Sequence, residues 1–565
     1  MLHRLLPPIA ALFIALLGTT AQAQTVGGDW PTTHALQSTA AGFAHAVCKL
    51  GDLNADGVTD FAIGLPYLST IGGTEAGAVQ FFSGQTGLLL RTAYGSSAFG
   101  HFGQALAGLG DLNGDGIHDY LIAAPQEEKN GMLQAGAVWV FSGADGSQIL
   151  HVDGTSSHGL FGFSVAGAGD LDGDQIEDFL VGAPGSSPNS NLGAGAAGVY
   201  SGSTGALLKT YFGAAAGDAF GYSVASAGDV NNDNFPDILI GAAATDVNFR
   251  SNCGSAYVYS GFNGNLLWHT DGANSDDYLG HAVAGAGDLN GDGYAEVILG
   301  APGSDPQNLA FAGSAFVYSG ATGSLLFRLD GVHATESLGA AVANAGDVDG
   351  DTINDILLGA PDANFQTGYA AIFSGVDGHL LHRRADAPWP SQLGFAVCGL
   401  GDLNGDGRAE VLIAAPHTMP LALGDGYVFI YGFDPYLTSN RSALSASLGG
   451  SVVFTLDFPI AFGNQRFRLL ATNHGLGSTL LGGIQIPLVA SGPVWDAMSA
   501  ATPPAIFTQA SGSLNSDGDA SSMLNLPAGV ASVLLNTDIH FSAFVFQPPT
   551  SGLASSAAVV LHLLP

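Results

Sequence analysis

The chain has 565 residues and carries 48 Asp and Glu against 13 Lys and Arg, which gives a formal net charge of −35. This charge repels nucleic-acid phosphates and anionic lipid headgroups, so nucleic-acid binding and membrane-surface binding are excluded. Apolar residues make up 47% of the sequence and charged residues 11%, a balance that excludes intrinsic disorder. The 83 glycines follow no collagen-like period and favour a turn-rich, all-β protein.

The N-terminus carries an apolar run from Leu5 to Gly18, which follows Arg4 and leads into the small-residue pattern Ala21-Gln22-Ala23. This pattern is typical of a secretory signal peptide and predicts that residues 1–23 are removed from a secreted or cell-surface protein. A membrane anchor is disfavoured because the run is short and contains two prolines. No later segment is predicted to span a membrane.

One sequence unit occurs seven times after this segment. It begins with Gly-Asp, and successive copies are 59 residues apart except for a last spacing of 55. Solenoid repeats of about 20 to 34 residues are too short to match this period. The third copy predicts strands at residues 163–166, 179–182, 196–200 and 206–210, with an acidic turn after the first and a tight turn after the third. Four short antiparallel strands make one propeller blade, so we expect a seven-bladed β-propeller over residues 24–433.

The seventh unit lacks a fourth strand after Phe433. Residues around 28–36 precede the first unit, at the place where a fourth strand would lie. We therefore expect the N-terminal segment to complete the last blade and to protect its edge.

Two short motifs flank the predicted strands of the third unit: Phe161-Gly162 before the first and Gly182-Ala183-Pro184 after the second. They resemble the FG-GAP repeat of integrin α-subunit propellers and of secreted bacterial relatives. The first motif recurs as Phe102-Gly103 and Phe220-Gly221, the second as Gly300-Ala301-Pro302 and Gly359-Ala360-Pro361, and Leu replaces Phe at Leu279, Leu338 and Leu393. The first unit departs most, with Gly42-Phe43 and Gly64-Leu65-Pro66. The resemblance covers residues 36–433 and implies an integrin-like propeller with calcium loops.

The acidic turn of each unit alternates oxygen-bearing side chains at its first, third, fifth and ninth positions. Oxygen ligands at this spacing in a tight loop favour Ca²⁺ over zinc or copper, so the sequence predicts up to seven calcium sites. The predicted side-chain ligands are Asp52, Asn54, Asp56 and Asp60; Asp111, Asn113, Asp115 and Asp119; Asp170, Asp172, Asp174 and Asp178; Asp229, Asn231, Asp233 and Asp237; Asp288, Asn290, Asp292 and Glu296; Asp347, Asp349, Asp351 and Asp355; and Asp402, Asn404, Asp406 and Glu410.

The family resemblance adds a backbone carbonyl ligand at the seventh position of each loop, here Val58, Ile117, Ile176, Phe235, Tyr294, Ile353 and Arg408. An EF-hand is disfavoured because position twelve of the first loop is Ile63 rather than Glu. A metal-free turn stays an alternative, since Asn and Asp favour turns by themselves. Turn chemistry alone, however, does not require acids at the first, fifth and ninth positions in all seven units.

Residues 434–565 lack the repeat, and their short apolar runs predict a separate, small C-terminal β-sandwich. These runs lie at 451–458, 467–472, 484–489, 532–535, 541–546 and 557–564. The sequence 517–519, Asp-Gly-Asp, is expected to be a plain turn rather than a partial cation loop. Cys48 and Cys398 occupy positions that hold Ala in the other five units, which favours buried free thiols, with a bridge between them as an alternative.

No linear catalytic motif is present, and the 16 histidines are dispersed, so no catalytic or cofactor-binding residue is assigned. We expect a secreted, calcium-binding propeller that acts as a binding or adhesion module for an extracellular glycan or protein ligand. The alternatives are a polysaccharide-active or phospholipid-active secreted enzyme that uses the propeller as a scaffold, and a structural envelope component. Strand alternation places the acidic turns and the turns between strands three and four on one face. The ligand is therefore expected on the other face, at loops 126–133, 185–192, 244–252, 303–309 and 417–424 and at the interblade loops such as 385–391.

Overall fold

The computed structural model describes residues 40–385, 391–416 and 426–432, together with single strands elsewhere between Val26 and Leu564. The chain divides into two compact units, which are described separately. The larger unit consists mainly of Thr32–Gly378 and Arg384–Tyr431, and the smaller one mainly of Gly432–Pro565. The predicted signal peptide, residues 1–23, lies outside the described residues. None of the helices in the described part of the chain is long and apolar enough to cross a membrane.

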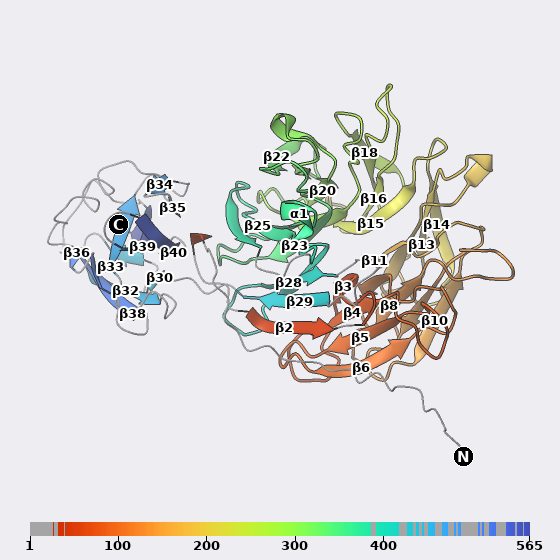
Figure 1. The fold of residues 1–565 in the computed structure, drawn as a ribbon, viewed down its shortest axis with the longest axis horizontal. Helices are drawn as coiled ribbons and strands as arrows, with labels where there is room; N and C mark the ends of the chain where they lie inside the picture. The colour runs from red at the N-terminus through yellow and green to blue at the C-terminus, as the bar shows by residue number, and fades with distance from the viewer. Residues whose placement is uncertain are drawn as a thin grey trace, which may run out of the picture. The chain divides into compact units, whose positions relative to one another are not determined.

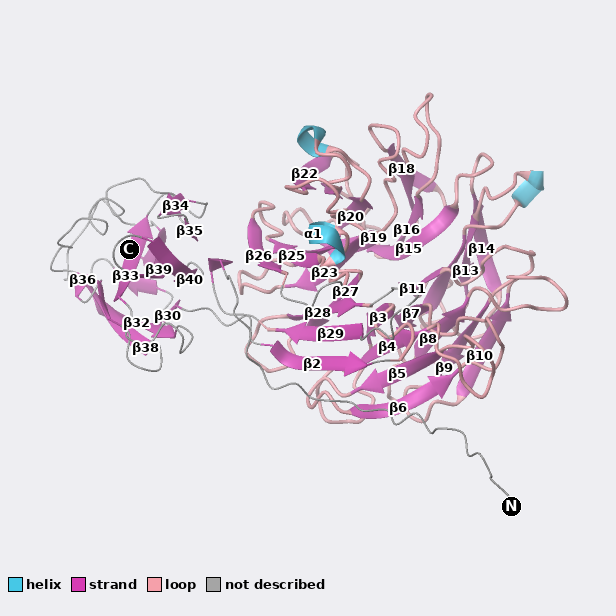
Figure 2. Ribbon diagram, in the orientation of Figure 1, coloured by secondary structure: helices cyan, strands magenta, loops and turns pink. Residues whose placement is uncertain are grey.

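The larger unit is a seven-bladed β-propeller, as predicted, and each blade is a four-stranded antiparallel sheet (Figure 1; Figure 2). Blade 1 contains β3 (Ala46–Lys49), β4 (Phe61–Leu65), β5 (Ala78–Phe82) and β6 (Leu89–Tyr94); blade 2 contains β7 (Ala105–Gly108), β8 (Tyr120–Ala124), β9 (Ala137–Phe141) and β10 (Gln148–Asp153). Blade 3 contains β11 (Ser164–Gly169), β12 (Asp178–Ala183), β13 (Ala196–Tyr200) and β14 (Leu207–Phe212); blade 4 contains β15 (Phe220–Gly228), β16 (Asp237–Ala242), β17 (Ser255–Tyr259) and β18 (Leu266–Asp271).

The remaining three blades follow the same order. Blade 5 contains β19 (Val283–Gly287), β20 (Glu296–Ala301), β21 (Ser314–Tyr318) and β22 (Leu325–Asp330), and blade 6 contains β23 (Ala341–Gly346), β24 (Asp355–Ala360), β25 (Tyr369–Phe373) and β26 (Leu380–Arg384). Blade 7 contains β27 (Ala396–Gly401), β28 (Glu410–Ala415), β29 (Gly426–Tyr431) and, from the N-terminal segment, β2 (Thr32–Ser38). The helical pieces are single turns: η1 (Pro188–Ser190), η2 (Pro306–Asn308) and α1 (Ala363–Gln366).

The core lies between neighbouring blades and is built mainly from the second and third strands. The second strand of every blade is buried along its whole length, which explains why it reads as an uninterrupted apolar run. Phe81 of blade 1, for example, packs against Tyr120 and Ile122 of blade 2 in one buried cluster. Each fully buried side chain of this size stabilises the fold by about 1.5–3 kcal/mol, so the interblade contacts are what hold the ring together.

The ring closes through β2, which pairs antiparallel with β29 and places Leu36 opposite Val428. Figure 1 shows the two strands side by side at the start and end of the propeller. Leu36 is buried in a cluster that also holds Phe61 of blade 1 and Ile430 of blade 7. The prediction that the N-terminal segment completes the last blade is therefore confirmed, with a strand that ends two residues later than expected.

The described strands of the smaller unit form two larger sheets and one hairpin. The first sheet holds β1 (Val26–Gly27), β31 (Ala443–Ser445), β33 (Arg466–Thr472), β37 (Ser511–Ser513), β39 (Asp538–Gln547), β40 (Ser551–Ser556) and β41 (Val559–Leu564). The second holds β30 (Leu437–Ser439), β32 (Gly450–Asp457), β36 (Phe507–Thr508) and β38 (Asp519–Leu526), and β34 (Thr479–Leu481) pairs with β35 (Ile484–Ile486). Five of the six predicted runs coincide with strands, and the run at 532–535 lies outside the described residues. The packing of the sheets as a sandwich stays a prediction.

The three cysteines are free thiols, so the alternative of a Cys48–Cys398 bridge is wrong for this structure. Cys48 and Cys253 are buried, and Cys398 is half-buried. Burial raises the pKa of all three thiols, which keeps them protonated and unreactive at neutral pH. Their role is to fill small spaces in the core.

Candidate metal-binding loops

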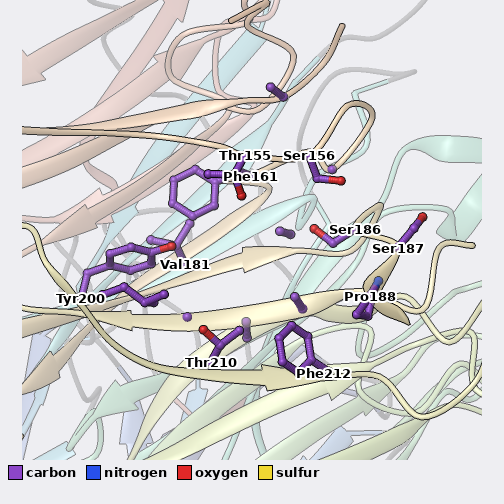
Figure 3. A pocket seen from close by; sticks show the side chains of 17 residues that line it. Thr155, Ser156, Phe161, Val181, Ser186, Ser187, Pro188, Tyr200, Thr210 and Phe212 are labelled. Carbon is purple, nitrogen blue, oxygen red and sulfur yellow. The ribbon is translucent and has the colours of Figure 1, made fainter. Parts of the chain in front are cut away.

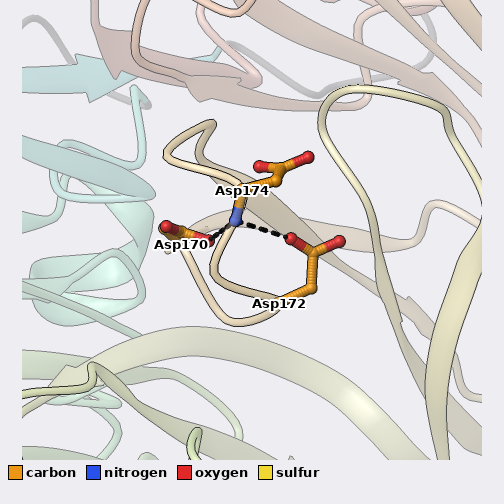
Figure 4. Close-up of side chains that lie close together, drawn as sticks. All are labelled: Asp170, Asp172 and Asp174. Atoms are coloured by element: carbon orange, nitrogen blue, oxygen red, sulfur yellow. Dashed lines mark hydrogen bonds between the residues drawn. The ribbon is translucent and has the colours of Figure 1, made fainter.

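Each acidic loop connects the first and second strands of a blade and folds around its own carboxylates. In blade 3, the backbone N–H of Asp174 donates to Asp170 Oδ1 at 3.1 Å and to Asp172 Oδ1 at 3.2 Å (Figure 4). The other Asp170 oxygen, Oδ2, accepts the N–H of Gln175 at 2.8 Å. These bonds close the chain into a tight Asx-type turn, in which three Asp side chains lie close together.

The hydrogen bonds to the first Asp recur in all seven loops, and the bond to the third residue is made in every loop except that of blade 4. The first Asp accepts the backbone N–H groups of the fifth and sixth residues in every loop. The fifth Asp accepts the N–H of the seventh residue, the position at which the family resemblance implies a carbonyl ligand; these donors are Val58, Ile117, Ile176, Phe235, Tyr294, Ile353 and Arg408. The structure thus brings the predicted positions together in one conformation repeated seven times.

The ninth position has a second role that the sequence did not reveal. Asp60 is fully buried, and its Oδ2 accepts the N–H of Leu53 at 2.8 Å while its Oδ1 accepts the N–H of Gly84 at 2.9 Å. Gly84 belongs to the turn between the third and fourth strands, so the carboxylate ties the acidic loop to that turn. The equivalent residues of blades 2, 3, 4 and 6 make the same two bonds. A Ser-Gly pair such as Ser83-Gly84 recurs at this turn, and this recurrence is the sequence signal that marks the partner of the ninth residue.

In blades 5 and 7 the ninth residue is a glutamate with a different partner set. Glu296 accepts the N–H of Leu289 at 2.7 Å and the side-chain amide of Asn290 at 2.9 Å. Glu410 accepts the amide of Asn404 at 2.9 Å in the same way. Each glutamate thus binds the third residue of its own loop, as Asp237 of blade 4 also does.

Burial of these carboxylates has a clear electrostatic consequence. It raises the pKa of Asp60, Asp178 and Asp237 to about 6, although the backbone N–H donors act in the opposite direction. Burial likewise raises the pKa of Glu296 and Glu410 to about 7, with a further contribution from the neighbouring aspartates. A bound cation would reverse both effects, because positive charge favours the ionised form.

The donor set fits a hard cation. Three carboxylate oxygens lie within 4.8 Å of one another in two loops, at Asp170, Asp172 and Asp174 and at Asp347, Asp349 and Asp355. These are the two loops that carry Asp rather than Asn at the third position. In blade 4, the side-chain oxygen of Asn231 is buried without a hydrogen-bond partner while its Nδ2 donates to Asp237 Oδ1 at 3.2 Å. A buried acceptor left open among carboxylates is what an oxygen-preferring cation requires.

The acidic loops share one face with the turns between the third and fourth strands, as strand alternation predicts. The hydroxyl of Ser83 donates to Asp56 Oδ2 at 3.2 Å, and that of Ser142 donates to Asp115 Oδ2 at 3.0 Å. We call this face the acidic-loop face. The face that carries the loops between the second and third strands and the interblade connections is called the opposite face.

On the opposite face, two basic residues are held by protein partners. Lys129 Nζ lies 3.1 Å from Glu127 Oε1 and 3.2 Å from Asp153 Oδ1. Arg250 Nη1 donates to the carbonyl of Gly272 at 2.7 Å. Phe249, in contrast, is fully exposed at a turn with a positive φ of 67°. The expected ligand loop 417–424 and residues 386–390 of the interblade loop lie outside the described residues.

Comparison with known proteins agrees with the blade structure. The model of the FG-GAP repeat matches residues 102–141, 220–259, 279–318 and 393–431, which correspond to blades 2, 4, 5 and 7. Integrin alpha-IIb of Homo sapiens is 32% identical over 218 residues, covering 36% of this chain and 20% of the integrin. Integrin alpha-3 of Cricetulus griseus is 31% identical over 200 residues, covering 32% and 18%. The chain thus spans about a fifth of the length of these relatives.

A solved structure, that of the Dos1 propeller, aligns with 72% of this chain and 93% of its own at 11% identity and a TM-score of 0.39. The propeller type is supported by the seven described blades, the FG-GAP match and the similarity to integrin α-subunits. The larger unit of this chain is an integrin α-like propeller, and four of its seven blades match the FG-GAP repeat.

Proposed function

We propose that the chain is a secreted or cell-surface propeller that binds calcium in its acidic loops and acts as a binding or adhesion module for an extracellular glycan or protein ligand. The observation that supports calcium binding is the repeated loop geometry. In five of the seven loops, the carboxylate at the ninth position accepts a hydrogen bond from the turn between the third and fourth strands. The similarity to integrin α-subunits supports the extracellular binding role.

The calcium ions would act on structure rather than on a reaction. In each loop, the side chains at positions one, three, five and nine and the carbonyl at position seven would hold the ion. Neutralising three or four crowded carboxylates would stabilise the acidic loop and, through the ninth residue, the adjoining turn. The opposite face carries none of these loops, so we assign ligand binding to it.

The first test is a calcium titration of the chelated full chain, followed by calorimetry. We expect several binding events and a rise in the melting temperature of the propeller, because binding to the native state alone adds to its stability. An unchanged melting temperature after chelation would contradict the calcium assignment.

The second test uses the same sample for ligand binding. A glycan array and a panel of immobilised extracellular proteins should detect a ligand, and substitutions in loop 244–252 of the opposite face should weaken its binding without lowering calcium affinity. A hydrolase and lyase screen distinguishes the enzyme alternative. Binding that only substitutions in the smaller unit abolish would make the propeller a spacer and contradict the assignment.

A further inference from the structure

In blades 2, 4 and 5, two large side chains lie opposite each other on the third and fourth strands and cover the same part of the blade surface. The third residue of the third strand lies opposite a residue of the outer strand, and the two stack. Trp139 and His151 are 5.0 Å apart between ring centroids, and Tyr257 and His269 are 5.5 Å apart. In blade 5, the guanidinium of Arg328 lies 5.3 Å from the centre of the Phe316 ring.

Blade 3 lacks both members of this pair. Gly198 stands at the position of the aromatic residue, and Thr210 stands opposite it in the same register. The two small residues leave a pocket of about 300 Å³, which lies at the lower end of the range of ligand sites. Figure 3 shows the rings of Phe161 and Tyr200 at one end of this pocket and Phe212 with Pro188 at the other.

The lining of the pocket combines aromatic rings with hydroxyl groups and contains no charged side chain. Five hydroxyls face it without a hydrogen bond to any group in the described part of the chain: those of Thr155, Ser156, Ser186, Tyr200 and Thr210. Burial raises the pKa of Tyr200 to about 12, so its hydroxyl stays a donor at neutral pH. A hydroxyl both donates and accepts, and an aromatic ring offers a flat apolar surface.

We propose that this pocket binds one or two sugar units of a neutral glycan. A sugar ring presents several hydroxyls and an apolar face, which is the complement of the lining, and the absence of charged side chains gives no recognition to an acidic or basic ligand. The inference rests on the proposed function and names the ligand class for it. The pocket runs along the strands of blade 3: Ser186 and Thr155, which follow β12 and β10, lie at its end on the opposite face, whereas Tyr200 lies at its other end, before the turn that bonds to the acidic loop.

The test transfers the filled arrangement of blade 4 into blade 3. The variant Gly198→Tyr/Thr210→His copies Tyr257 and His269, and the residue two positions on is a tyrosine in both blades, Tyr200 and Tyr259. A Cβ at position 198 would approach the Tyr200 ring to 2.7 Å, so this ring, which stacks on Phe179, has to shift toward the arrangement that Tyr259 has beside Tyr257 in blade 4. The calcium-loaded full chain is screened on an array of uncharged oligosaccharides, and the best-binding one is titrated by calorimetry. We expect at least a tenfold loss of affinity without a lower melting temperature.

A second, milder variant protects the test against misfolding. Ser186→Ala/Thr210→Val removes two hydroxyls and leaves the backbone unchanged, and it should also weaken glycan binding tenfold. The matched control is Thr92→Val, at the equivalent position of blade 1, where Gln80 lies opposite; its affinity should equal that of the wild type. The inference is overturned if both variants bind the glycan as the wild type does, or if no uncharged glycan binds at about 1 mM.

The same variants separate this inference from the proposed function. A protein ligand that binds wild type and Gly198→Tyr/Thr210→His equally would leave the binding module intact and overturn only the glycan pocket. The absence of any glycan or protein ligand on either panel would instead contradict the proposed function itself.

Discussion

The ninth carboxylate of the third acidic loop offers a direct measure of what calcium contributes. Asp178 is fully buried, and it accepts the N–H of Leu171 at 2.9 Å and that of Gly202 at 3.0 Å. The change Asp178→Asn keeps the size of the side chain but removes its charge and one acceptor. We expect this change to be nearly neutral without calcium and strongly destabilising with it.

The expected magnitude without calcium follows from two opposing terms. Placing an amide N–H against a buried backbone N–H costs about 1–3 kcal/mol. The ionised carboxylate itself is costly in the folded state, because burial raises the pKa of Asp178 from 3.8 to about 6, which corresponds to about 3 kcal/mol at neutral pH. Since the substitution removes this second cost, the two terms nearly cancel.

With calcium, the balance changes because the loop loses one of its four carboxylates. A site at a calcium concentration of 100 times its Kd stabilises the native state by about 2.7 kcal/mol, and a hundredfold loss of affinity removes nearly all of it. Urea unfolding of wild type and variant measures the change in the free energy of unfolding twice, once with 1 mM calcium and once with a chelator. The control is Glu128→Gln, which removes an exposed charge outside the acidic loops. Equal destabilisation in both conditions would refute the reasoning.

Three further predictions concern the propeller as a whole. In a chelator, the stability of the propeller should fall as the pH rises from about 5 to 8. The reason is that the folded-state pKa values of the ninth carboxylates exceed their unfolded values, so the native state binds more protons in that range. Calcium should flatten this dependence, and a chelated protein that gains stability over the same pH range would contradict the prediction. Gly169→Ala should lower the melting temperature, since the glycine has a φ of 71° and its Cβ would meet Pro236 Cγ at 2.5 Å; Gly173→Ala, with a φ of 85° and open space around it, separates backbone strain from the clash. Deletion of residues 24–38 removes β2 and exposes the edge of β29, so thermal unfolding should show a large loss of stability, and wild-type melting would disprove the closure role.

The propeller could be predicted from the sequence because its information is local and repeated. Each 59-residue unit contains its own strand order, and the continuous apolar runs of second strands such as Phe179–Val181 mark full burial without any knowledge of the partner. The closing strand was predictable from a count alone, since the seventh unit is one strand short. The shape of the acidic loops was predictable for the same reason, because the first, fifth and seventh positions of a single turn come together by local folding; their role as cation ligands stays a prediction.

Side-chain partners across the fold could not be predicted in this way. Lys129 and Arg250 suit ligand recognition by composition, but in the folded chain an ion pair and backbone carbonyls hold them. Asp60 is a loop residue by sequence, yet its partner Gly84 lies 24 positions further along the chain. Such pairings depend on how close the turns of one blade come to each other, and the spacing of motifs along the sequence does not determine that distance.

The pocket of blade 3 shows how repetition and tertiary register work together. Gly198 and Thr210 are ordinary residues of two strands when each is considered alone, and the sequence gives no reason to connect them. The register places them opposite each other, at the position where blades 2, 4 and 5 carry stacked pairs. Because blades 2, 4 and 5 show how large side chains fill this position, the open volume in blade 3 can be compared with them. A single loss of bulk could be compensated by its neighbour, but a loss of both partners leaves open space lined by hydroxyls, and this makes blade 3 the place to look for a bound sugar.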